Sequence, residues 1–309
     1  MQENSSPPAH VLLLGAAGFI GQHVLHALLA QGVRVTAVCR SSGQHEGNAL
    51  LAWKAMRLEQ MLIKQDWQAH LQGVDVVINC AGILRQRMGE RYDAIHHRMP
   101  AALAAACAQA GTRLIHTSAL GLHANARSRF LSSKLLGEQA ICNSGADYCL
   151  VRPSLIDGTG GFGASWLRML ASWPVHFVPR GAVGKIAAVQ ASDLAQAYLR
   201  LALMPCLAAH QQANLGGERL FAYAEYLQLL RGFEAGRKPA LQIFMPDWTM
   251  RLGAHFCDLF RFSPFSYGHW ILLQRDNVPL PNALPELLGR APQPVAYQRI
   301  ALKDDFRMS

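Results

Sequence analysis

Short runs of apolar residues alternate with stretches of helical periodicity over the first half of the chain. The run 11–14 contains only Val and Leu and ends at a glycine, which is typical of a strand buried on both faces. Runs of similar character predict strands over 11–14, 33–38, 75–79, 113–117 and 148–151. Helical spacing between them predicts helices over 19–30, 49–61, 101–110 and 132–143. This alternation predicts an α/β fold with a parallel, doubly wound sheet of the Rossmann type.

The pattern loosens after about residue 155. A glycine-rich stretch, 158–163, precedes predicted helices over 166–173 and 193–204, and beyond 214 the segments are short, aromatic and interrupted by prolines. We therefore expect a dinucleotide-binding Rossmann core over residues 10–155. Residues 156–309 are expected to hold the remaining sheet elements and a smaller C-terminal region that forms or caps the substrate side.

Composition excludes two classes of protein. Hydrophobic residues make up 51% of the 309 positions and charged residues only 16%, which is too apolar for an intrinsically disordered chain. The formal net charge is +9, from 29 basic and 20 acidic side chains, but no basic run of the kind found in nucleic-acid-binding tails occurs. We expect no nucleic-acid partner, and an anionic cofactor or membrane remains open for the excess charge.

Two further features bear on location. The apolar stretch 11–30 is interrupted by polar residues and three glycines, so it predicts a strand and a helix rather than a membrane span. The seven cysteines are scattered, without a C-x-x-C pair or zinc spacing, which predicts reduced thiols and no metal site. We expect a cytoplasmic protein, with a position peripheral to the inner membrane as the alternative.

A glycine pattern lies where the first predicted strand ends and a helix begins. Gly15, Gly18 and Gly21 have the spacing G-x-x-G-x-x-G, and Phe19 and Ile20 fall in the first helical turn. The first glycine permits a sharp turn, the second lets the backbone approach a pyrophosphate, and the third lets the helix pack closely on the sheet. The N–H groups of the helix N-terminus then bind the phosphates. The pattern predicts a nicotinamide dinucleotide site.

The end of the second strand bears on which dinucleotide binds. An acidic residue there binds the ribose 2′-hydroxyl of NAD, whereas an arginine accommodates the 2′-phosphate of NADP. Here the strand leads into Arg40 and Ser41, and no acidic residue occurs before Glu46. Because a guanidinium matches phosphate geometry, NADP(H) is favoured over NAD(H), and a solvated strand-end arginine is the alternative.

Five motifs follow one another within residues 10–205: Gly15-Ala-Ala-Gly-Phe-Ile-Gly21, Asp75-Val-Val-Ile-Asn-Cys-Ala-Gly82, His116-Thr-Ser-Ala-Leu-Gly121, Phe130-Leu-Ser-Ser-Lys134 and Arg152-Pro-Ser154. Together they resemble the extended and atypical short-chain dehydrogenase/reductase superfamily, whose members are often epimerase/dehydratase-like. With Ser133-Lys134-Leu-Leu-Gly-Glu138 and Asp276-Asn-Val278, the chain is similar to the branch that includes the nucleotide-binding accessory subunit of respiratory complex I.

The resemblance implies roles for individual residues. Ala81 and Gly82 belong to the turn that passes the adenine ribose, and Asp66 stands where a family acidic residue contacts adenine. Ser118 aligns with the serine that binds a substrate carbonyl. Two further residues are implied at the nicotinamide: Lys134, which binds the nicotinamide ribose and lowers the pKa of a catalytic tyrosine, and Pro153.

The sequence departs from this family at position 130. The family places its proton-donating tyrosine four residues before the lysine, on the same helix face, and this chain has Phe130 there. Since general acid–base catalysis contributes about 10²–10⁴-fold, a conventional carbonyl reduction would be crippled. His116 or His123 could replace the missing donor, although for each of them a packed or surface imidazole is the more ordinary interpretation.

Two functions therefore stand side by side. One is an NADP(H)-dependent oxidoreductase or epimerase that acts on an unknown small substrate with another group in place of the tyrosine. The other is a non-catalytic NADP(H)-binding module, structural or redox-sensing, associated with a membrane or a respiratory complex. The aromatic segment 248–273 could dock onto a membrane or a partner, or it could cap the substrate cleft.

Overall fold

The structure is a computed structural model, and it describes residues 10–40, 47–86, 91–124, 128–235, 238–249, 252–253 and 267–295. Its centre is a seven-stranded parallel sheet with the strand order β11-β6-β5-β4-β1-β2-β3. The strands are β1 (Val11–Leu14), β2 (Val35–Cys39), β3 (Leu51–Ala55), β4 (Val76–Asn79), β5 (Arg113–Thr117), β6 (Tyr148–Pro153) and β11 (Gln212–Leu215). The doubly wound Rossmann sheet expected from the sequence is confirmed.

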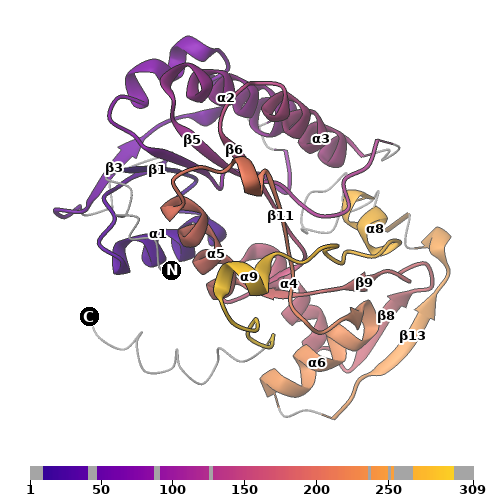
Figure 1. Cartoon of the computed structure of the whole chain (residues 1–309). Helices are drawn as coiled ribbons and strands as arrows, with labels where there is room; N and C mark the ends of the chain where they lie inside the picture. Colours follow the sequence, from indigo (N-terminus) through magenta and orange to yellow (C-terminus); the bar gives the residue numbers. More distant parts are fainter. Residues whose placement is uncertain are drawn as a thin grey trace.

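The alternating side chains of β1 fill the cores on the two faces of the sheet. Val11 and Leu13 pack into a cluster with helices α1 (Phe19–Ala30), α5 (Ala191–Leu203) and α9 (Leu284–Leu288). Leu12 and Leu14 pack into a second cluster, which includes residues of α2 (Met99–Ala110) and Ile141 of α3 (Arg129–Cys142). Figure 1 shows α2 and α3 on one side of the sheet and α1 and α5 on the other.

The helix predicted over residues 49–61 is wrong. Residues Leu51–Ala55 form β3, which pairs in parallel with all five residues of β2, and short 3-10 helices follow at Leu58–Gln60 (η1) and Lys64–His70 (η2). β3 is the edge strand and no residue of it is fully buried, so its sequence lacks the apolar run that marks the central strands. Pairing with β2 outweighs the weak helical pattern here.

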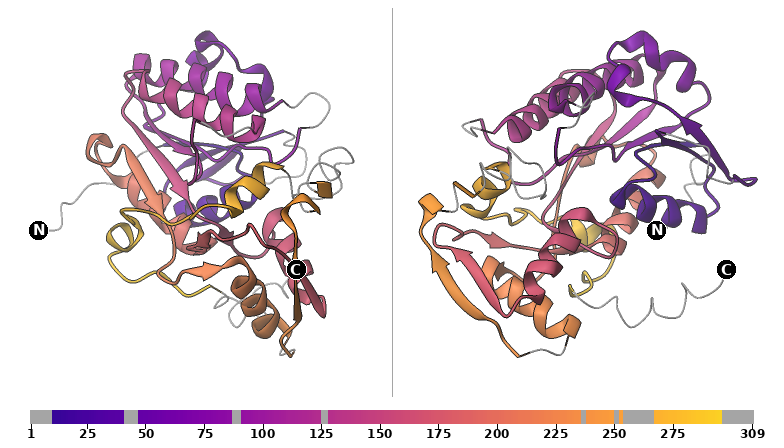
Figure 2. Two further views of the ribbon diagram at one scale, coloured as in Figure 1. Left: turned by 90° about the vertical axis from the view of Figure 1, so that its right-hand side faces the viewer. Right: turned by 180° about the vertical axis from the view of Figure 1, so that it is seen from behind.

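The smaller part of the molecule lies below the carboxyl edge of the sheet in Figure 1, and Figure 2 shows it from two further sides. It holds three two-stranded sheets: β7 (Ile156–Asp157) with β10 (Val189–Gln190), β9 (Lys185–Ile186) with β12 (Phe221–Ala222), and β8 (Val175–Pro179) with β13 (Leu241–Met245). Its helices are α4 (Phe162–Ser172), α6 (Tyr223–Ala235) and α8 (Tyr267–Leu273).

After residue 156 the chain passes several times between the Rossmann part and the smaller part. β11 and α5 come after residue 156 and belong to the Rossmann sheet and its helical layer, as does α9. The remaining short elements are η3 (Asp93–Arg98), a π-helical segment before α2, and η4 (Ala208–His210). Among the described helices none is both long and apolar enough to cross a membrane.

Candidate functional site

The glycine turn after β1 has no room for side chains. Gly15 has φ +73°, and a Cβ on it would lie 2.9 Å from the backbone N of Ala81. A Cβ on Gly21 would lie 2.1 Å from the carbonyl oxygen of Gly15, and Gly18 donates its N–H to that same oxygen at 2.9 Å. Gly15 and Gly21 are therefore required by close backbone contacts, and a Cβ on Gly18 would lie 3.1 Å from the Gly15 carbonyl oxygen.

Helix α1 begins at this turn without a cap of its own. Gly18 is the N-cap residue, no side chain caps the helix, and the first turn holds no acidic residue. The intrahelical bonds start with Gln22, whose N–H donates to Gly18, so the N–H groups of Phe19 and Ile20 precede the hydrogen-bonded ladder. Such a helix start, with free backbone donors and no acidic residue in its first turn, fits the pyrophosphate of a dinucleotide.

A loop from the smaller part packs on the same turn. Cβ atoms placed on Gly158 or Gly161 would each lie 2.9 Å from the ring of Phe19. The loop is anchored by Arg168, which donates to the Gly158 carbonyl at 2.8 Å and pairs with the buried Asp157 carboxylate. The glycine-rich stretch therefore lies over the first turn of α1.

Three residues are predicted to bind the adenine and its ribose: Arg40, Ser41 and Asp66. Arg40 directly follows β2 and is exposed, at the carboxyl edge of the sheet, while Ser41 lies outside the described residues. Asp66 is placed in η2, where its carboxylate accepts the backbone N–H of Ile63 at 3.0 Å. That carboxylate is thus already engaged in capping its own helix.

The turn after β4 is held by a buried amide. The Asn79 side-chain oxygen accepts the backbone N–H of Ala81 at 3.0 Å, which orients its amino group toward Nδ1 of His116 at 3.0 Å. Asn79 must donate to this nitrogen, so the proton of the neutral His116 ring sits on Nε2. The turn leads into Gly82 at the carboxyl edge of the sheet, beside the glycine turn.

The ends of β5 and β6 bring two more predicted residues to this edge. Ser118 follows β5 and donates its backbone N–H to Val151 at 2.8 Å, and Pro153 ends β6 and accepts from the Leu120 N–H at 3.2 Å. The Ser118 hydroxyl is buried and has no hydrogen-bond partner among the described residues, and the same holds for both ring nitrogens of His123. A buried hydroxyl without a partner is costly unless a ligand supplies one.

Phe130 and Lys134 face each other on α3. The lysine Nζ lies 5.8 Å from the centroid of the Phe130 ring, and Phe130 is buried. The ring makes edge contacts with Tyr92 at 5.6 Å and with His96 at 5.5 Å between centroids. Position 130, where the family resemblance implies a catalytic tyrosine, is therefore occupied by a packed ring inside an aromatic cluster.

Close helix packing brings His96 to this cluster. A Cβ on Gly137 of α3 would lie 2.0 Å from the His96 carbonyl oxygen, so this glycine lets η3 lie directly against α3. His96 Nε2 accepts the Ile83 N–H at 3.1 Å, and its Nδ1 lies 3.2 Å from the Ser133 hydroxyl. Sequence reasoning missed Tyr92 and His96, because only the packing of η3 on α3 brings them to position 130.

Burial lowers the pKa values of His96, His116 and Lys134, and the charge of Lys134 lowers those of the two histidines further. Burial, and secondarily the charge of Lys134, lowers the pKa of His116 to about 3, and burial likewise holds the pKa of His96 well below its usual value. Burial also lowers the pKa of Lys134 to about 8, against a smaller opposing effect of Glu138. The Glu138 carboxylate is bound by Arg152, at 2.7 and 2.5 Å, so it is already paired. Lys134 is thus an amine whose proton is held loosely near neutral pH.

The C-terminal part closes over this region. Ile271 and Leu272 of α8 pack against Phe130 and Leu131, and a Cβ on Gly121 would lie 2.9 Å from Leu272. The Asn277 backbone oxygen accepts the Ser154 hydroxyl at 2.6 Å. Of the aromatic segment 248–273, residues 250–251 and 254–266 lie outside the described residues.

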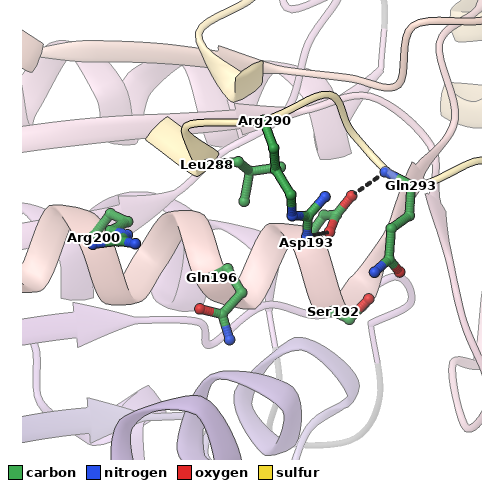
Figure 3. A pocket seen from close by; sticks show the side chains of 7 residues that line it. All are labelled: Ser192, Asp193, Gln196, Arg200, Leu288, Arg290 and Gln293. Atoms are coloured by element: carbon green, nitrogen blue, oxygen red, sulfur yellow. Dashed lines mark hydrogen bonds and ion pairs between the residues drawn. The ribbon is translucent and has the colours of Figure 1, made fainter. Parts of the chain in front are cut away.

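A separate cavity of about 320 Å³ lies between α5 and the chain after α9 (Figure 3). Asp193, which is buried, accepts from Arg290 at 2.5 Å and from the Gln293 backbone N–H at 2.5 Å. None of the predicted site residues lines it. No group of three or more His, Cys, Asp or Glu that could hold a metal occurs within the part of the chain that the structure describes.

Comparison with known proteins gives the relatives of the chain. A family model described as NAD(P)H-binding matches residues 15–193, more than half of the 309 positions. The ceramide reductase of Caulobacter vibrioides is 26% identical over 243 residues, which cover 77% of this chain and 74% of that protein. NADH dehydrogenase [ubiquinone] 1 alpha subcomplex subunit 9 is 23% identical in Arabidopsis thaliana and 24% in Dictyostelium discoideum, each over 71% of this chain. The chain spans only 56% and 62% of the length of these two.

Solved structures agree in fold. A nucleoside-diphosphate-sugar epimerase from Staphylococcus aureus has a TM-score of 0.68 at 16% identity, over 92% of this chain and 97% of that one. UDP-glucuronic acid 4-epimerase from Bacillus cereus, in complex with UDP-glucuronic acid and NAD, has a TM-score of 0.65 at 17% identity, over 93% and 95%. At such low identity the likeness establishes the fold alone.

Proposed function

The chain belongs to the NAD(P)H-binding family, and on that premise we propose that it is an NADPH-dependent reductase of a carbonyl group on an apolar substrate, with Lys134 as the proton donor. The observations that carry this proposal are the approach of Lys134 to the Phe130 ring and the buried Ser118 hydroxyl, which has no hydrogen-bond partner among the described residues. The cofactor fit rests on the glycine turn, where a Cβ at Gly15 or Gly21 would collide with backbone.

The residues divide the work as follows. The bound nicotinamide supplies a hydride to the carbonyl carbon. Ser118 donates its hydroxyl hydrogen bond to the carbonyl oxygen and positions it. As negative charge grows on that oxygen, the Lys134 ammonium gives it a proton, and the resulting amine regains a proton from water. The product is the alcohol.

Lys134 suits this role better than either histidine suggested by the sequence. With a pKa of about 8 it is mostly protonated at neutral pH and releases its proton readily. His116 has a pKa of about 3 and is neutral, so it holds no proton to give as an imidazolium. His123 has two buried ring nitrogens without partners and remains the competing donor.

The choice of an apolar substrate rests on the surroundings of position 130. Phe130 and Leu131 are packed by Leu122, Ile271 and Leu272, so a substrate that reaches Lys134 passes hydrocarbon side chains. The Caulobacter relative is named as a reductase of ceramide, which is a lipid. We infer that the carbonyl belongs to a lipid-like molecule rather than to a sugar nucleotide.

A pH profile tests the donor. If Lys134 is the acid, kcat/KM for a long-chain ketone stays level at neutral pH and falls above about pH 8. Lys134→Arg should keep the cofactor affinity and move this fall to higher pH, while Lys134→Met should remove it and lower turnover. Loss of turnover in His123→Gln, with a pH profile that Lys134→Arg leaves unchanged, would assign the donor to His123 instead.

Cofactor preference has its own test. We infer that Arg40 binds the 2′-phosphate, because it follows β2 at the carboxyl edge and is exposed there. Arg40→Ala should weaken NADPH binding by about tenfold or more and leave NADH binding nearly unchanged, measured by titration of protein fluorescence. Equal losses for both cofactors would disprove the 2′-phosphate contact.

A second function is favoured by the same Phe130. A module that holds NADPH without turnover, within a membrane-bound or respiratory complex, needs the glycine turn but no tyrosine. The two relatives named as alpha subcomplex subunit 9 of NADH dehydrogenase support this alternative. Nucleotide that stays bound through purification, together with no turnover on any ketone, would favour it over the reductase.

A further inference from the structure

The two-stranded sheet β8–β13 forms the outer edge of the smaller part of the molecule (Figures 1 and 2). One of its faces is partly covered, although Phe244 of β13, which pairs with Val178 on that face, is 53% exposed. His176 and Val178 on β8 are buried, and Gln242 on β13 donates to the Ala224 carbonyl of α6 at 3.4 Å. Because side chains alternate along a strand, the residues between these point away from α6.

Those outward residues are apolar and exposed. Phe177 and Ile243 are direct partners in the register, and they are 49% and 40% exposed. Leu241 is 65% exposed, and Trp173, which precedes β8 by two residues, is 45% exposed. We call Trp173, Phe177, Leu241 and Ile243 the outer sheet face. Soluble proteins rarely leave such a contiguous apolar surface without a binding role.

Charge indicates what this face meets. Neither β8 nor β13 contains Asp, Glu, Lys or Arg. Residues 158–192 contain no Asp or Glu and three Lys or Arg, of which Arg168 is paired with Asp157. Exposed Arg180 follows β8 directly, and exposed Lys238 lies three residues before β13. Asp247, the acidic residue beyond β13, binds the Gly181 N–H at 2.7 Å. An apolar surface flanked by cations, with tryptophan at its edge, suits the interface of an anionic bilayer.

We propose that the outer sheet face docks the protein onto the surface of an anionic lipid bilayer. Phe177, Leu241 and Ile243 enter the boundary between headgroups and acyl chains, while Arg180 and Lys238 lie near the phosphates. This places a membrane contact on the two-stranded sheet β8–β13 instead of on the aromatic segment 248–273, for which docking and capping of the substrate cleft are the alternatives. The proposal does not depend on the reaction proposed above, since a non-catalytic module would dock in the same way.

Co-sedimentation of the full chain with phosphatidylcholine vesicles, with and without phosphatidylglycerol, tests the proposal. The protein should pellet with the anionic vesicles, and Phe177→Ser/Ile243→Ser should lower its partition coefficient by about tenfold or more. The matched control is Leu50→Ser/Ile63→Ser, which changes two exposed apolar residues on the Rossmann part and should leave partitioning unchanged. Both variants should bind nucleotide as the wild type does.

Two further measurements keep the test decisive. Leu241→Ser, on an edge strand and with little packing to lose, should also weaken vesicle binding if the double variant does not fold. Brominated lipid should quench tryptophan fluorescence less in Trp173→Phe than in the wild type. No pelleting with anionic vesicles, or equal pelleting of test and control variants, overturns the proposal. A wild-type dimer that Phe177→Ser/Ile243→Ser converts to a monomer would also overturn it, by assigning the face to a second copy of the chain.

Discussion

Restoring a tyrosine at position 130 tests the catalytic reasoning most directly. Phe130→Tyr adds a hydroxyl to a ring whose centroid lies 5.8 Å from the Lys134 Nζ. A cation within about 4–6 Å lowers the pKa of an acid by about 1–3 units, which would bring the phenol toward neutral pH. Since a positioned general acid contributes about 10²–10⁴-fold, we expect kcat to rise by at least about tenfold if Lys134 already acts in the wild type.

The substitution also has a structural cost, which the assay must separate from catalysis. The ring is packed by Tyr92 and His96, and a buried hydroxyl without a partner costs about 1–3 kcal/mol, so the melting temperature should fall by several degrees. Turnover is followed by the loss of NADPH absorbance with a long-chain ketone. In Phe130→Tyr/Lys134→Met the gain should vanish, because the phenol then lacks its neighbouring cation. A folded, NADPH-binding Phe130→Tyr protein whose kcat and pH profile match the wild type would refute the reasoning.

Two further predictions concern stability and the cofactor turn. The pKa of His116 is about 3 in the folded protein and near 6.5 in the unfolded chain, so between these pH values the unfolded chain binds more protons. The melting temperature should therefore fall as the pH is lowered from 6.5 to 3. It should fall less in His116→Gln, which lacks the titrating ring. A steeper fall in the variant would contradict this. Gly21→Ala places a Cβ 2.1 Å from the Gly15 carbonyl oxygen, so it should abolish NADPH binding in a nucleotide titration. The control is Gly232→Ala in α6, whose added Cβ meets nothing within 4 Å. Calorimetry should show that this control stabilises the protein by about 0.5–1 kcal/mol.

The parts of the fold that sequence reasoning predicts are those where one local pattern decides the outcome. β1 is predictable because both of its faces are buried, and the glycine turn because its spacing matches the backbone contacts at Gly15 and Gly21. β3 is not predictable in this way, because it is a half-exposed edge strand without an apolar run. Its strand conformation is determined by the parallel pairing with β2, which the local sequence does not show. α6 is not predicted either, because it lies outside the alternating strand–helix pattern of the Rossmann part. Its apolar residues pack against α4 and β8 of the smaller part.

In the candidate site, too, residues that belong to a local motif are predicted from the sequence, whereas residues brought there by packing between elements are not. Ser118, Phe130 and Lys134 are predicted from the motifs that carry the family resemblance. Tyr92 and His96 are not, because their approach to Phe130 depends on Gly137 admitting the backbone of η3. The pKa of Lys134 cannot be predicted from the sequence either, since it depends on burial and on the nearby Glu138 carboxylate.

Phe19 contacts the loop at Gly158 and Gly161, so the proposed cofactor site on the Rossmann part and the smaller, substrate-side part of the molecule meet at this ring. The ring belongs to the first turn of α1, and the loop leads into α4 of the smaller part. Because the loop and the ring are in contact, a shift of the loop would displace the first turn of α1, where we propose that the cofactor phosphates bind. Thermodynamic reciprocity then requires that each ligand change the affinity for the other by the same factor.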